Sequence, residues 1–153
     1  MPRIDSLRDA FWKRHSNPKS GWSRVLVLPA LLAAVYHRNG RLAAVAVVFT
    51  VINPVLFSPV EDDDAWMTRV VLAERWWTER GNGTLTLSYP GFLNLLNVPI
   101  TAYAFLAASR EEPARTALAG AVSMGLKFWY VGALVRRYEA ATERGVDDRT
   151  TDE

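Results

Sequence analysis

The sequence contains no cysteine and only two histidines among its 153 residues. The absence of cysteine excludes disulfide bonds, thiolate metal sites and cysteine nucleophiles. His15 and His37 fall in different segments, so a histidine-based metal centre or a Ser-His-Asp triad lacks the residues that it needs. We therefore predict no catalytic residue, no metal ion and no cofactor, and no motif in the chain names a reaction.

Charged residues are nearly absent from four long apolar segments, and this is the strongest pattern in the chain. Half of the residues are hydrophobic, yet the mean hydropathy is near zero because polar segments lie between the apolar ones. The runs ALLAAV and LAAVAVVFTVI are apolar on every side, which is typical of helices in lipid rather than of helices with one buried face. We predict helical spans at residues 22–36, 42–57, 89–108 and 114–135.

The predicted fold class is all-α, a four-span helical membrane bundle that forms one integral membrane domain over residues 1–140. Residues 141–153 are predicted to form a flexible polar tail. The first two spans measure roughly 22–24 Å at 1.5 Å per residue, less than the hydrocarbon core of a typical bilayer, so flanking residues must snorkel or the bilayer must thin. A soluble two-helix hairpin is the alternative for these two segments.

A tryptophan-rich amphipathic segment lies between the second and third spans. In a helix over residues 65–80, the side chains of Trp66, Val70 and Trp77 fall on one narrow stripe. The segment is too short and too polar to cross a bilayer, so we predict that it lies along the inner interface with these three side chains inserted into lipid. A helix packed on a soluble core is the alternative.

Four consecutive carboxylates, at residues 61–64, precede this predicted helix. They can accept hydrogen bonds from free backbone N–H groups and meet the positive end of the helix dipole. They could also hold a divalent cation that bridges to lipid phosphates, because hard cations take several oxygen ligands. We favour the helix start over the cation site.

The distribution of lysine and arginine predicts how the chain is oriented. On the side of the termini there are six such residues in the N-terminal segment 1–24, three in the loop between the second and third spans and four in the C-terminal tail, thirteen in all. The opposite side has four, and all six tryptophans fall on the more basic side. The positive-inside rule then places both termini in the cytoplasm, and the predicted localisation is the cell membrane, with several spans.

Lys127 is a charged residue near the centre of the fourth predicted span, where an isolated charge costs roughly 2.5–3.5 kcal/mol. It must therefore find polar partners inside the bundle or snorkel to the inner interface. We predict an intramembrane polar cluster at its depth, which consists of Lys127, Asn53, Asn94, Asn97 and Thr101. This cluster is interpreted either as a structural crosslink or as an anion or proton site.

A second candidate site lies around the inner ends of the spans. This predicted inner-face cluster consists of His15, Asn17, Arg24, Arg69 and Glu74. Cationic side chains at a membrane surface can bind anionic lipid headgroups, although basic residues in such places are also ordinary topology signals.

Several short motifs resemble a family of small, uncharacterised, multi-span membrane proteins, a domain of unknown function seen chiefly in halophilic archaea. The resemblance covers about half of the chain. It rests on Phe11-Trp12, His15-Ser16-Asn17-Pro18, Trp22-Ser23-Arg24, Asn53-Pro54, Phe57, Pro59, Trp66-Met67-Thr68-Arg69, Glu74-Arg75-Trp76, Lys127, Trp129 and Arg137-Tyr138-Glu139. The resemblance implies a membrane protein and supplies no catalytic residue.

Three classes of function remain open. The first is a non-catalytic integral membrane protein, structural or accessory, whose cytoplasmic face binds lipid or a partner. The second is an interfacial enzyme acting on a lipid or isoprenoid substrate with His15 or Glu74 as acid or base, and the third is an oligomeric carrier or channel that uses Lys127. We favour the first because no acid/base or nucleophile pair has a recognisable spacing.

The predicted partners are the lipid bilayer and either anionic lipid headgroups or a membrane protein. We predict no nucleic-acid partner, because the basic residues flank spans rather than forming a basic face with base-reading side chains.

Overall fold

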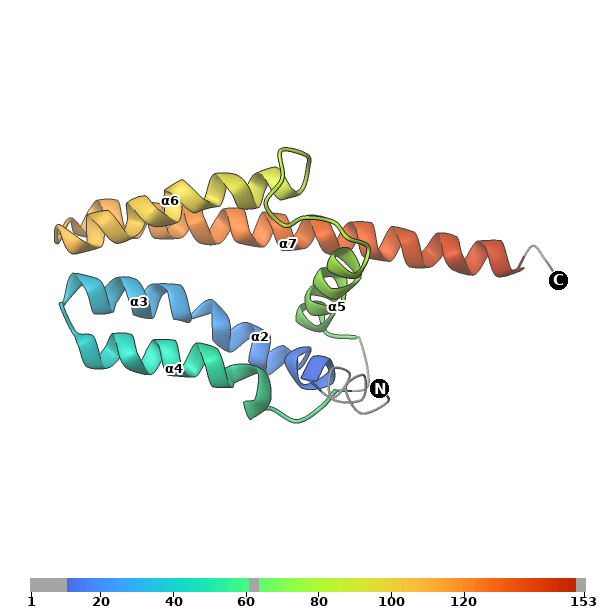
Figure 1. Cartoon of the computed structure of the whole chain (residues 1–153), viewed down its shortest axis with the longest axis horizontal. Coiled ribbons are helices and arrows are strands. Elements are labelled where there is room, and N and C mark those ends of the chain that lie inside the picture. The colour runs from blue at the N-terminus through green and yellow to red at the C-terminus, as the bar shows by residue number, and fades with distance from the viewer. Residues whose placement is uncertain (1–10, 61–63, 151–153) are drawn as a thin grey trace.

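The chain folds as six labelled helices in a computed structural model that describes residues 11–60 and 64–150, with the side chains of residues 145–150 left aside (Figure 1). The described residues contain no strand, so the predicted all-α class is confirmed. The helices are α2 (Pro18–Val25), α3 (Val27–Tyr36), α4 (Gly40–Leu56), α5 (Trp66–Glu79), α6 (Gly91–Ser109) and α7 (Pro113–Thr150).

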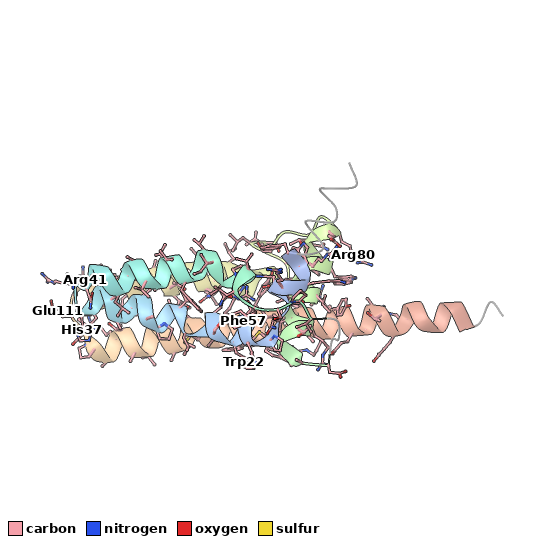
Figure 2. The ribbon with its side chains drawn as sticks, turned by 90° about the horizontal axis from the view of Figure 1, so that it is seen from below. Trp22, His37, Arg41, Phe57, Arg80 and Glu111 are labelled. Atoms are coloured by element: carbon pink, nitrogen blue, oxygen red, sulfur yellow. The ribbon has the colours of Figure 1, made fainter. Side chains whose placement is uncertain are left out.

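Two antiparallel hairpins, α3/α4 and α6/α7, lie alongside each other with both of their turns at the same end (Figure 1). Figure 2 shows His37 and Arg41 of the first turn beside Glu111 of the second. An ion pair joins the turns, because Arg38 Nη2 lies 3.0 Å from Glu111 Oε1. Both residues have a left-handed backbone, with φ of 50° and 58°, which reverses the chain within a short turn.

The break between α2 and α3 corrects the first predicted span, which was drawn as one helix over residues 22–36. The structure starts α2 earlier, at Pro18, and starts a new helix at Val27. Proline at position 29 has no N–H to donate to the carbonyl of Val25, and its ring crowds that carbonyl, so a continuous helix is disfavoured there. Pro29 instead falls in the first turn of α3, where no such hydrogen bond is needed.

The amphipathic helix was predicted over residues 65–80 and is present as α5. Its predicted insertion into lipid is wrong for Val70 and Trp77, which are only 5% and 8% exposed and pack in the protein core. Their stripe lies against the α7 residues Tyr130, Val131, Leu134 and Val135. Helical periodicity identified the apolar face correctly, and the neighbouring helix, rather than lipid, covers it.

Among the carboxylates predicted to cap α5, the one that the structure describes, Asp64, is not its N-cap residue. The N-cap residue is Ala65, which forms no side-chain capping bond, and Asp64 is exposed. The other three carboxylates of the predicted cation site, at residues 61–63, lie outside the described residues.

At the C-terminus, α7 is helical through Thr150 and so enters the segment predicted to be a flexible tail, whose flexibility remains a prediction.

Two helices, α6 and α7, are long and apolar enough to cross a membrane, and α4 is a shorter apolar helix. Length and composition alone are weak evidence, because a mostly buried helix in a soluble protein can satisfy the same criterion. Here the most apolar windows of α6 and α7 are only 28% and 44% buried. These two helices therefore differ from the buried core helices of a soluble protein.

Candidate functional site

A cavity of about 440 Å³ lies between α2, α3, α5, α6 and α7. Most of its wall is apolar. The apolar lining consists of Gly21, Val25, Leu28, Met67, Val70, Met124, Phe128 and Val131, and the polar lining consists of Arg24, Glu74, Asn97, Thr101, Ser123 and Lys127. A space with long apolar walls and a few converging polar groups has the composition of a binding site for an amphiphilic molecule.

Lys127 is paired with a carboxylate that the sequence analysis had assigned to the other candidate cluster. Its Nζ lies 3.5 Å from Glu74 Oε1 and 4.9 Å from the centre of the Tyr130 ring. The pairing follows from the packing of α5 on α7, which turns Glu74 toward Lys127. The side chains are 50% and 31% exposed, so this ion pair is long and partly solvated.

Arg24 approaches the same cavity from α2 and is held by two neutral groups. Its Nη1 donates to His15 Nε2 at 2.9 Å, and its Nε donates to the carbonyl of Ser20 at 3.3 Å. Burial, together with the charge of Arg24, lowers the pKa of His15 from 6.5 to about 4. The imidazole is therefore neutral at pH 7 and can accept the hydrogen bond from the guanidinium.

Asn53 does not join Lys127, and it binds α2 instead. Its side chain is fully buried, accepts a hydrogen bond from Ser20 Oγ at 2.6 Å and donates one to Ser23 Oγ at 2.8 Å. These two hydrogen bonds join the C-terminal end of α4 to α2. Ser20 and Ser23 were not predicted as partners of Asn53, although their spacing of three residues puts both hydroxyls on one face of a helix.

The remaining members of the predicted intramembrane cluster form separate links. Thr101 Oγ1 lies 2.7 Å from Ser123 Oγ and 3.4 Å from Asn97 Oδ1, which connects α6 with α7 at the cavity wall. Asn94 donates to the carbonyl of Thr84 in the preceding loop. The hydrogen bonds thus divide the predicted cluster into separate groups, and only Lys127, Asn97 and Thr101 reach the cavity.

The predicted inner-face cluster is also divided. Arg24 and Glu74 both line the cavity, and His15 contacts it only through its hydrogen bond with Arg24. Asn17 instead caps α2 and donates to the carbonyl of Ser58. Arg69 lies on the other side of α5 from the cavity lining, with its Nε 3.0 Å from Glu139 Oε1. The predicted binding of anionic lipid headgroups by the five residues of this cluster remains a prediction.

The described residues contain no group of three or more His, Asp or Glu side chains that could hold a metal ion. The chemistry available in the cavity is instead that of two cations and one carboxylate set beside hydroxyl and amide groups. Such a set can bind and orient a charged molecule.

These features define an all-helical protein with two helices able to cross a membrane and a charged cavity beside them. The chain belongs to a family of unknown function (DUF6653), whose model matches residues 1–152. This confirms the predicted membership of a domain of unknown function, while the predicted multi-span membrane character of that family and its occurrence in halophilic archaea remain predictions. No curated protein matches the chain, and no solved structure matches it.

Proposed function

We propose that the protein is a non-catalytic integral membrane protein in which both hairpins cross the bilayer and the cavity at their inner ends holds a lipid headgroup. The observation that carries the proposal is the number of large apolar side chains that both hairpins expose. These side chains include Val45, Val48, Val51, Ile52 and Val55 of α4, Leu96, Val98 and Leu106 of α6, and Leu118 and Val122 of α7. Soluble monomers rarely expose so large an apolar area, because it would be unfavourably hydrated.

The lengths of α4, α6 and α7 support spans in a thin bilayer, whereas α3 has 10 residues, roughly 15 Å, and would span only together with α2. The 17 residues of α4 give roughly 26 Å and the 19 residues of α6 roughly 29 Å at 1.5 Å per residue. Lys127 lies 14 residues beyond the start of α7, roughly 21 Å from the turn. The charged cavity would then lie toward the inner membrane surface, at a depth where long side chains reach polar headgroups.

The charges support binding rather than catalysis. Arg24 and Lys127 outnumber Glu74 in the cavity, which favours an anionic headgroup. The two groups suited to acid/base chemistry, His15 and Glu74, are each engaged by one of these cations. For this reason we favour a lipid-binding or accessory role over a lipid-modifying enzyme or a carrier that uses Lys127.

Cysteine labelling tests the topology directly, because the natural chain has no cysteine to remove. We expect Asn39→Cys and Ser109→Cys, at the two hairpin turns, to react with a membrane-impermeant maleimide added outside intact cells. Thr78→Cys, an exposed position on α5, serves as the matched control and should react only after permeabilisation. Labelling of either turn only after permeabilisation would overturn the proposed topology, and release of the protein by alkaline carbonate would overturn membrane integration.

A further inference from the structure

We propose that the cavity binds a phosphate-headed amphiphile whose anionic head takes Lys127 away from Glu74, so that Glu74 is a built-in competitor for the site. The inference rests on the proposed lipid-binding function and deepens it. It assigns opposite roles to two residues of one ion pair, which makes it testable apart from membrane topology.

The cavity has more cationic than anionic side chains. Arg24 comes from α2 and Lys127 from α7, so cationic groups reach the cavity from two walls, while its one lining carboxylate, Glu74, comes from α5. Arg24 donates to the Ser20 carbonyl and to neutral His15. Among the described residues no carboxylate forms an ion pair with Arg24, so its charge remains available to an anion.

The existing ion pair between Lys127 and Glu74 is weak. The distance of 3.5 Å between Lys127 Nζ and Glu74 Oε1 exceeds that of a good charge-assisted hydrogen bond, and half of the Lys127 side chain is exposed. Partly solvated pairs of this kind contribute little. Arg24 and Lys127 line the same cavity, and Glu74 acts on Arg24 only through its charge, without an ion pair. A phosphate offers three acceptor oxygens to these two cations, whereas the one carboxylate of Glu74 already contacts Lys127.

The rest of the cavity is mostly apolar. Beyond the charged groups the walls are formed by Val25, Leu28, Val70, Phe128 and Val131, which suit a hydrocarbon chain rather than a free ion. The volume of about 440 Å³ falls within the range of small-molecule sites. The cavity therefore matches a molecule with one anionic head and an apolar chain.

An aromatic cluster beside the cavity provides a signal for occupancy. The rings of Trp22, Trp66 and Phe128 lie with their centres 6.1 to 6.3 Å apart, and Phe128 lines the cavity. A chain that enters beside Phe128 changes the surroundings of both tryptophans. We therefore expect a saturable change in tryptophan fluorescence on binding.

The test is a titration of the full-length protein in maltoside micelles with dodecyl phosphate, followed by tryptophan fluorescence and by thermal unfolding. Glu74→Gln removes the competing charge while keeping the side-chain shape, and we expect binding about three- to tenfold tighter. Lys127→Met should weaken binding about tenfold, which is the scale of one charged hydrogen bond. Lys19→Met, an exposed lysine at the start of α2, makes the same substitution outside the cavity and should bind like the natural chain.

Two further ligands separate the sources of the chemistry. Inorganic phosphate tests the head alone, and dodecylphosphocholine tests the chain with a zwitterionic head, and both should bind at least tenfold more weakly. Equal binding of inorganic phosphate would overturn the amphiphile, and equal binding of dodecylphosphocholine would overturn the anionic specificity. Weaker binding by a folded Glu74→Gln variant would overturn the competitor role. These outcomes are independent of the labelling at the hairpin turns, so failure of this inference can be distinguished from failure of the proposed topology.

Discussion

The two hairpins have the same overall form, but they are held in different ways. In α6/α7 small side chains let the helices approach closely, and α6 buries Ala104, Ala107 and Ala108 at 1% exposure or less. In α3/α4 the longer helix buries only Ala46 and Asn53. The first hairpin is held by the polar link from Asn53 to α2 and by the packing of Leu32 against α6. The second hairpin is held by packing along much of its length. Substitutions at the two kinds of contact should therefore have different consequences.

The largest effect is expected where α6 is most closely packed. Ala104 is fully buried against Leu32, Ala108 and Ala119, and leucine at this position should force the helices apart. We expect Ala104→Leu to lower the free energy of unfolding by about 3 kcal/mol, at the upper end of the effects of overpacking. Thermal unfolding in maltoside, followed by circular dichroism, measures the change. Ala102→Leu, exposed on the same helix, is the control, and equal melting temperatures for the two variants would contradict the packing argument.

An intermediate effect is expected at the polar link of the first hairpin. Asn53→Ala removes two hydrogen bonds and leaves the buried Ser20 hydroxyl without its acceptor. Leaving such a group unsatisfied should destabilise the protein by about 2 kcal/mol. Hydrogen exchange should speed up in α4 more than in α6. Asn94→Ala, which removes one bond to a loop carbonyl, is the control and should leave α4 unchanged. Uniform loosening of both hairpins would show that they are not held separately.

The smallest effect concerns pH. The pKa of His15 is lowered from 6.5 to about 4, so the unfolded chain takes up this proton at a higher pH than the folded chain does. The contribution of neutral His15 to the free energy of unfolding is fully present above pH 6.5. It is lost progressively as the pH falls toward 4. Discounted for partial exposure, the loss is on the order of 1 kcal/mol. Unfolding profiles of the natural chain and of His15→Gln should converge as the pH falls through this window, and parallel profiles would contradict the assignment.

Local features were predictable from the sequence because they depend on neighbouring residues. The second apolar segment is one example, since it was predicted over residues 42–57 and α4 covers Gly40–Leu56. The apolar stripe of α5 is another. What covers that stripe was not predictable, because periodicity shows which face is apolar and not what lies against it.

The candidate site was predictable only in part, for the same reason. Glu74 and Lys127 were both identified as candidates, but they are 53 positions apart, and only the packing of α5 on α7 brings them together. Equal depth along two spans suggested that Asn97 would lie near Lys127, and Asn53 was expected to join them from the second span. Depth does not specify the direction in which a side chain points, and Asn53 lies against α2. The hydroxyl partners Ser20, Ser23 and Ser123 were not predicted, because helical spacing shows that Ser20 and Ser23 share a face but not which side chain lies against it.

The order of these polar contacts along the chain has a consequence for synthesis. Asn53 pairs with Ser20 and Ser23, Ser123 pairs with Thr101, and Lys127 pairs with Glu74. In each case the partner of the later residue has already been made when that residue leaves the ribosome, because the chain emerges from its N-terminus. In a membrane, the later polar side chain of each pair can therefore be satisfied as soon as its own helix packs, without waiting in lipid for a helix that does not yet exist.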